Sequence, residues 1–452
     1  MTAVDVLELA RGIAGSARSG EQVEAYAVRT RETDIEVFRG EVESLSVAGV
    51  SGVGIRVVTD HRQGFAWAGT FDAEVVAETL AEARDNASIA EADEWSGLAT
   101  AADAASAPVV DLDLWSEALL SVPTDEKVRF AIDLDQRVSA ADPRIREVDS
   151  TSYGDGLVES AIASSEGVEA SVRRTVCSAS SSALAEADGQ TQSGYGFTFG
   201  RSFADLDADF IVAMAAERAL RLLGAQALKS RRIPVVLDPI VTAQFLGVLS
   251  AAFNGESMLK GRSLFLDRVG EAVAAPHVQL ADDPTDAFMP GATTHDSEGV
   301  PCRQNRLVVD GVLQGFLHNS ATARRAGTKT TGSATRAGYM STPGVGVRAL
   351  SLQPGARGFD EIVGSLPDAL YVQSVSGLHS GTNPISGDFS VGAEGLVVRD
   401  GALAEPVREV TVASTLPRML LDIAEIGSDV TRLGGSTAGV TLVVSEMTMS
   451  GG

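Results

Sequence analysis

The five histidines are the residues of this 452-residue chain best suited to hold a metal ion or to act as catalytic bases. A zinc protease site built on a helix needs two histidines close together on that helix, and a carboxylate that activates water. The two nearest histidines along the chain, His277 and His295, are 18 residues apart, so no single helix supplies both imidazoles. The sequence therefore predicts no metal site and no catalytic residue in this chain alone.

Three of the histidines stay open as parts of a divergent hydrolase site. His295 is followed by Asp296 and Glu298 in a segment rich in turn residues, and His318 follows an apolar run. His379 takes the place of serine in a GLHSG stretch, the segment that comes closest to the G-x-S-x-G motif of serine hydrolases. We favour simpler interpretations of these three positions. They are a solvated loop at His295, a half-buried side chain at His318 and a tight turn at His379.

The charge of the chain argues against several classes of partner. It carries 36 Lys+Arg against 61 Asp+Glu, a net charge of −25. Proteins that bind nucleic acids or anionic lipids rely on lysine and arginine near the phosphates. We therefore expect no direct nucleic-acid partner and no membrane partner.

Cysteine usage and hydropathy indicate the compartment. Cys177 and Cys302 are too few and too widely spaced for a disulfide framework or a thiolate zinc cluster. The first residues are acidic where a signal peptide needs positive charge. No uninterrupted apolar stretch reaches the ~20 residues that span a bilayer. We expect a cytoplasmic protein.

Hydrophobic periodicity predicts two α/β modules in the N-terminal half. Apolar and polar residues alternate over 22–69, which is typical of a half-buried antiparallel sheet, and an amphipathic helix follows over 73–87. After a linker, a helix with Thr124 as its N-cap precedes further strands over 146–203 and a helix over 210–223, closed by Gly224.

The C-terminal half has a different pattern. An apolar segment at 240–253 is followed by strands and turns, with Asp-Gly hairpin turns at 310–311 and 400–401. A helix over 415–426 and a last strand over 440–444 complete the chain. We predict an α+β fold with N-terminal α/β modules at 1–110 and 111–228, each with antiparallel strands and amphipathic helices, and a β-rich C-terminal domain with an apolar helix at 229–452.

Several segments together resemble a known family. Gly315–Arg325 reads GFLHNSATARR, Ser380–Gly395 reads SGTNPISGDFSVGAEG, and Pro406–Leu420 reads PVREVTVASTLPRML. With a TTGSAT stretch at 330–335, they resemble the PmbA (TldE) branch of the TldD/PmbA family, whose older label is modulator of DNA gyrase. The likeness runs in the expected order over nearly the whole chain.

The resemblance implies a division of labour between two subunits. TldD-like chains carry H-E-x-x-x-H on a helix and a late cysteine that hold zinc, whereas PmbA-like chains lack the motif and pair with TldD in a cytoplasmic metallopeptidase that trims unfolded peptides. Aligned through Lys260-Gly261, this chain has Leu246 and Ala251 in place of the histidines and Gly247 in place of the glutamate. The late cysteine is also missing. The resemblance thus implies a non-catalytic subunit without a cofactor of its own, with zinc in a TldD-like partner.

Three hypotheses about function follow. The first is the PmbA-like subunit, which binds peptides and a TldD-like partner. The second is a stand-alone divergent hydrolase that uses His295, His318 or His379. The third is a homodimer that binds peptides without protease activity. The candidate peptide-binding residues lie in or next to the segments that carry the resemblance, and they are His318, Asn319, Gly332, His379, Asn383 and Asp388.

Overall fold

Six long strands form a curved antiparallel sheet in the computed structural model, which describes residues 4–451. Their order is β3-β2-β1-β4-β5-β6, so β1 pairs with β4 and both predicted N-terminal modules contribute to one sheet. The module boundaries themselves stay predictions. The strands are β1 (Glu21–Phe38), β2 (Glu41–Thr59), β3 (Arg62–Ala68), β4 (Ile145–Ser164), β5 (Glu169–Ala187) and β6 (Gln190–Gly200).

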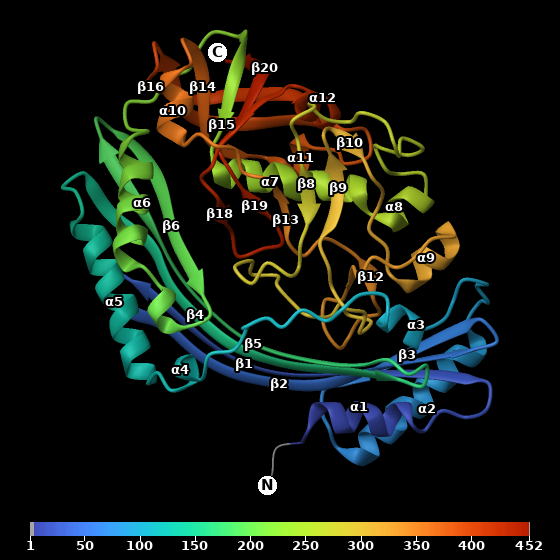
Figure 1. Cartoon of the computed structure of the whole chain (residues 1–452). Helices are drawn as coiled ribbons and strands as arrows, with labels where there is room; N and C mark the ends of the chain where they lie inside the picture. Colours follow the sequence, from blue (N-terminus) through green and yellow to red (C-terminus); the bar gives the residue numbers. More distant parts are fainter. Residues whose placement is uncertain (1–3, 452) are drawn as a thin grey trace.

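The convex face of this sheet is covered by helices, and the concave face holds the C-terminal domain (Figure 1). Alternate residues of a strand point to opposite faces. Odd-numbered residues of β1 such as Val23 and Ile35 pack under the helices, and even-numbered residues such as Glu24 and Tyr26 point the other way. The helices are α1 (Val6–Ala14) and α2 (Ala73–Ile89) at one end, and α5 (Thr124–Ala140) and α6 (Ala208–Leu220) at the other.

Two details of the predicted helices are wrong. The N-cap of α5 is Pro123, and Thr124 is the first helical residue and makes no capping bond. Asp125 and Glu126 in the first turn favour the start of the helix through its dipole instead. Helix α6 ends at Leu220, and Gly224, whose φ is 81°, lies in the turn that follows it.

The linker between the modules is largely irregular. It contains the short helices α3 (Ala101–Ala104) and α4 (Glu117–Leu120), and a 3₁₀ turn, η1 (Phe203–Asp205), precedes α6. Arg324 of the C-terminal domain holds the linker in place. Its guanidinium donates to the backbone carbonyls of Trp95, Gly97 and Leu98 at 2.7–3.1 Å.

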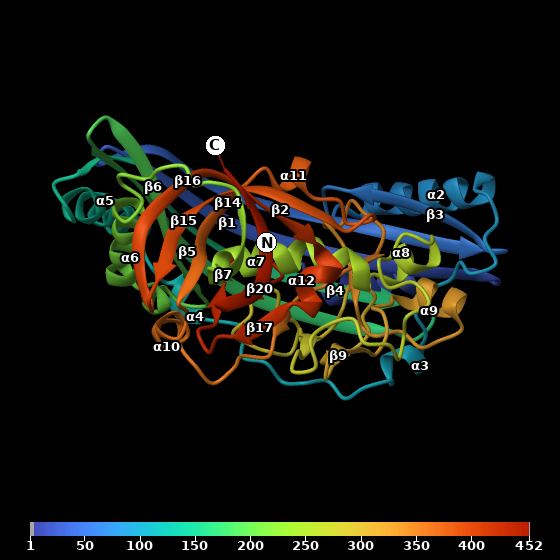
Figure 2. The same cartoon turned by 90° about the horizontal axis from the view of Figure 1, so that it is seen from above.

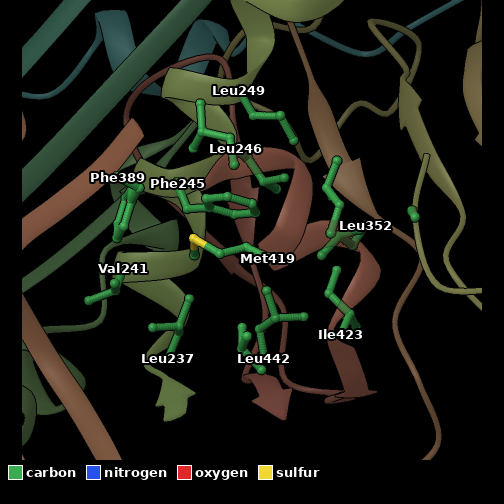
Figure 3. Close-up of a cluster of buried hydrophobic side chains, with 14 of the residues drawn as sticks. Leu237, Val241, Phe245, Leu246, Leu249, Leu352, Phe389, Met419, Ile423 and Leu442 are labelled. Carbon is green, nitrogen blue, oxygen red and sulfur yellow. The ribbon is translucent and has the colours of Figure 1, made fainter. Parts of the chain in front are cut away.

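A second six-stranded sheet, of order β16-β15-β14-β7-β20-β17, forms the body of the C-terminal domain. An additional pairing of β16 with β20 partly closes it. The largest apolar core cluster of the described residues lies between this sheet, the apolar helix α7 (Pro239–Leu249) and α12 (Leu416–Leu421) (Figure 3). The strands are β7 (Arg231–Leu237), β14 (Asp368–Ser376), β15 (Asp388–Arg399), β16 (Ala402–Thr415), β17 (Ile423–Ile426) and β20 (Leu442–Ser450).

Smaller elements lie between this sheet and the N-terminal sheet, and Figure 2 shows the whole C-terminal domain lying along the long strands. A four-stranded sheet comprises β8 (Leu280–Asp282), β9 (Asn305–Val309), β10 (Val312–Leu313) and β13 (Leu350–Leu352). Two short pairs are β11 (Ala334–Thr335) with β12 (Gly344–Val345), and β18 (Thr431–Arg432) with β19 (Ala438–Gly439). The remaining helices are η2 (Ser250–Phe253), α8 (Gly255–Leu259), α9 (Ser320–Ala326), α10 (Phe359–Gly364) and α11 (Leu378–Gly381).

The predicted α+β class and the two Asp-Gly turns are confirmed. Asp310 and Asp400 have φ of 51° and 49°, and each is followed by a glycine with positive φ, as type I′ hairpin turns require. The predicted helix over 415–426 is wrong beyond α12, because the chain then forms β17 and pairs with β20. The last strand starts at Leu442 and runs further than predicted. In the described part of the chain, no helix combines the length and the apolar composition needed to cross a membrane.

Candidate functional site

The three positions that the resemblance aligns with the zinc motif lie on α7 and η2. Leu246 has no exposed surface and packs in the core near Phe245 and Met419 (Figure 3). Gly247 is on the exposed side of α7, and a Cβ added there would meet nothing within 4 Å. Ala251 is partly buried. None of these side chains has an atom that binds zinc, so the residues present do not fit the metal.

The three histidines of the hydrolase hypothesis lie on separate elements. His295 lies in the segment between β8 and β9, His318 just before α9, and His379 in α11. No hydrogen bond among residues 4–451 joins any two of them. The same residues contain no group of three or more His, Cys, Asp or Glu side chains arranged to hold a metal ion.

His318, Asn319 and Gly332 are brought together by the fold. The His318 backbone amide donates to Thr331 Oγ1 at 2.8 Å, and the Thr331 amide donates to the His318 carbonyl at 3.1 Å. Asn319 caps α9, since its Oδ1 accepts from the Thr322 amide at 2.9 Å. Gly332 has φ of 69° and leaves no room for a side chain beside a neighbouring carbonyl. These polar groups thus hold local structure together.

His318 also lines a cleft large enough for a peptide segment. Only 4% of the residue is exposed, and burial lowers the pKa of its imidazole, which favours the neutral form. The cleft has a volume of about 750 Å³ and includes Met258, Phe316 and Lys329. Its wall combines apolar side chains with polar ones, as in clefts that bind small ligands.

His379, Asn383 and Asp388 form a second, separate group. His379 is exposed in α11. Asn383 Oδ1 accepts from the amides of Ile385 and Ser386 at 2.9 and 3.1 Å, and Asp388 accepts from the Ser386 hydroxyl at 2.6 Å. Asn383 and Asp388 therefore shape an exposed loop. Among the described residues, no hydrogen bond connects this group with the one around His318.

A buried charge cluster, not predicted from the sequence, lies between the two layers. Arg56 of β2 donates to Glu24 of β1 at 3.1 and 2.6 Å, and it lies 3.4 Å from Glu298 of the C-terminal domain. Glu298 also accepts from the amide and hydroxyl of Ser320, both at 2.8 Å, and Arg336 pairs with Glu24. All four charged side chains are 4% exposed or less.

The electrostatics of this cluster favour ionised side chains. Burial alone would raise the pKa of Glu24, but the charges of Arg336 and Arg56 outweigh it and the pKa is lowered. The sequence signals were Glu24 and Arg56, each a charged residue between two apolar residues of a predicted strand. The partners of Glu24 lie up to 312 residues away along the chain, so no local pattern could have identified them.

Three family profiles match the chain in order. They are PmbA/TldA metallopeptidase domain 1 over residues 23–87, the central domain over 117–223 and the C-terminal domain over 230–451. The chain is 28% identical over 449 residues to Metalloprotease PmbA of Escherichia coli O157:H7, covering 99% of this chain and 96% of that protein. It is 28% identical over 376 residues to a Metalloprotease TldD homolog of Haemophilus influenzae, covering 80% and 76%.

Solved structures share the fold at lower identity. A proposed modulator of a DNA gyrase from Thermotoga maritima superposes with a TM-score of 0.89 at 24% identity, over 98% of each chain. TldE from Thermococcus kodakarensis gives a TM-score of 0.86 at 21% identity, over 95% of this chain and 97% of that one. The profiles and relatives cover all three parts of the chain, which belongs to the PmbA/TldD metallopeptidase family.

Proposed function

We propose that this chain is the non-catalytic, PmbA/TldE-like subunit of a metallopeptidase that trims unfolded peptides, and that zinc is held by a TldD-like partner subunit. The observation that carries the proposal is the state of the three motif positions. Leu246, Gly247 and Ala251 replace two imidazoles and a carboxylate, and Leu246 is sealed in the apolar core. Apolar side chains can neither bind the ion nor move a proton in hydrolysis.

An open sheet edge supports the need for a partner. Residues 41–50 of β2 pair with β1 on one side only, because β3 pairs with β2 from Val53 onward. This edge exposes aliphatic side chains on both faces, with Leu45 46% and Val47 49% exposed on one face and Val50 48% exposed on the other. Open edges with apolar side chains promote association unless another chain covers them. A TldD-like subunit is the occupant that we propose.

The cleft beside His318 supports peptide handling. It would take a short extended segment between the β9–β10 hairpin and α9, with Phe316 as an apolar contact. The neutral His318 would act as a hydrogen-bonding group there. We assign it no role in proton transfer, because the hydroxyl beside its Nδ1, that of Thr322 at 3.2 Å, also bonds to Asn319 in the cap of α9. Residues 4–451 also contain no group of His, Cys, Asp or Glu side chains arranged to hold a metal ion.

A reconstitution assay tests the proposal. Hydrolysis of an unstructured peptide is measured with this chain alone, with a purified TldD-like subunit alone, and with both together. Each sample is repeated with a metal chelator, and with a partner whose motif glutamate is replaced by glutamine. We expect chelator-sensitive activity only with the intact partner, increased by this chain. Stoichiometric zinc and hydrolysis by the chain alone, or a mixture no more active than the partner alone, would overturn the proposal.

A further inference from the structure

A small cavity lies between the concave face of the N-terminal sheet and the C-terminal domain. Its volume is about 110 Å³. The sheet side comprises three cross-strand pairs of β4 and β5 on the face that looks toward the C-terminal domain. These pairs are Val158 with Arg174, Ser160 with Val172, and Ile162 with Ala170. The other side comes from residues 293 and 295–297 together with Arg336 and Arg348.

Two arginines at this cavity lack an acidic partner. Within residues 4–451 the Arg174 guanidinium has no hydrogen-bond or ion-pair partner, although the residue is only partly exposed. Arg348 donates from Nη2 to Ser297 Oγ at 2.7 Å and to the Ala334 carbonyl at 2.8 Å, while its buried Nε has no partner in the described chain. Burial and then the positive charge of Arg348 lower the pKa of Arg174, and both side chains line the same cavity.

The acidic groups nearby are already engaged. Glu24 and Glu298 serve Arg56 and Arg336. Asp296 lines the cavity, but its two oxygens accept three backbone N–H groups, and burial and the charge of Glu298 raise its pKa to about 7. Burial lowers the pKa of His295, which therefore adds no positive charge at neutral pH. Asp282 accepts from the Arg348 and Ala349 amides through Oδ1, and its charge interacts with that of Arg348. Within residues 4–451, the guanidinium at the cavity with neither an acceptor nor a nearby acidic group is therefore that of Arg174.

We propose that this cavity is an anion site in which Arg174 and Arg348 bind a carboxylate, and that its natural occupant is the free C-terminus of a peptide. The last part rests on the proposed function in peptide handling. Guanidinium groups match the planar, two-oxygen geometry of a carboxylate. The small volume and the apolar side chains of Ile162 and Ala170 match a terminal group with a small side chain. Arg174 and His295 are partly exposed, so a chain end can reach them from solvent.

Direct binding to the full-length chain tests the site. N-acetyl-trialanine with a free carboxyl terminus and its C-terminal amide are titrated by calorimetry at constant ionic strength, with sodium acetate and inorganic phosphate as separate arms. The variant is R174Q. The matched control is R173Q, because Arg173 is the preceding residue of β5, points to the opposite face and lies over the Trp115 ring at 4.9 Å.

We expect the peptide acid to bind at least tenfold more tightly than the amide. R174Q should lower the affinity for the acid at least tenfold, and R173Q should leave that affinity unchanged. The unfolding temperature of unliganded R174Q should equal or exceed that of the wild type, because the substitution removes a repulsion. Equal binding of acid and amide, or R174Q binding like the wild type, overturns the site. Binding of acetate or phosphate but not of the peptide acid overturns the peptide assignment. These results need no partner subunit, so they are separate from the outcome of reconstitution.

Discussion

Replacing Arg56 by methionine tests whether the buried charge cluster holds the two layers of the protein together. The Arg56 side chain is 4% exposed, and its loss takes the nearest guanidinium away from Glu298, which is fully buried. Removing one partner of a buried ion pair costs about 3–5 kcal/mol, because the other charge stays buried without compensation. We expect the free energy of unfolding to fall by an amount in this range.

Urea unfolding followed by circular dichroism measures the change, with R39M as the matched control. Arg39, in the turn between β1 and β2, pairs with Glu147 of β4, but these side chains are 70% and 35% exposed. Exposed pairs contribute about 0–1 kcal/mol. The reasoning is refuted if R56M unfolds within about 1 kcal/mol of R39M.

The same cluster has a defined pH dependence. The pKa of Glu24 is lowered in the folded protein, so its contribution to stability is present above the ordinary carboxyl pKa and is lost as pH falls through the folded pKa. The stability difference between the wild type and E24Q should therefore shrink from pH 7 toward pH 3. A difference that stays constant over this range would contradict the assignment of Glu24 as an ionised partner.

Other substitutions test the core, a buried acid and the open edge. L246A should lower the free energy of unfolding in urea by about 2–5 kcal/mol because it leaves a cavity. G247A, on the exposed side of α7, should be neutral or stabilising. Equal losses of unfolding free energy in the two variants would contradict the packing role of Leu246. Burial raises the pKa of Asp282 to about 6, so the stability of the wild type relative to D282N should fall as pH rises from 4 to 7. A difference in unfolding temperature between the two proteins that does not change with pH would refute this. L45E should weaken binding to a TldD-like subunit at least tenfold by calorimetry without changing the unfolding midpoint, and unchanged affinity would exclude this edge from the interface.

Local patterns in the sequence predict much of the fold. The period-2 alternation over 22–69 corresponds to β1, β2 and β3, and the Asp-Gly pairs at 310 and 400 correspond to hairpin turns. Where the prediction failed, tertiary pairing decided the outcome. Residues after Leu421 are compatible with a helix, but pairing with β20 satisfies their backbone as a strand.

The candidate site was harder to predict. Alternation of apolar and polar residues along a strand indicates one buried face of a sheet, and the prediction assumes that the other face is in water. The C-terminal domain covers the concave face of the sheet, so Glu24 and Arg174 occupy positions that alternate like solvent-exposed residues and yet lie between two layers. His318 and Gly332 are only 14 residues apart in the sequence, so their proximity in the fold comes from local chain structure. The cluster of Glu24, Arg56 and Glu298 required the whole fold.

The arginines near the boundary between the C-terminal domain and the rest of the chain fall into two kinds according to their hydrogen bonds, and the difference supports a binding role for Arg174. Arg324 fastens the linker, Arg56 bonds to Glu24, and Arg218 of α6 donates to Asp238 and to the Gln373 carbonyl, both at 2.7 Å. Each of these guanidiniums exchanges water for fixed acceptors, so desolvation is offset in the folded chain. The Arg174 guanidinium loses water on folding without gaining a hydrogen-bond acceptor. Its burial therefore opposes folding unless an anion from outside the chain accepts its hydrogen bonds.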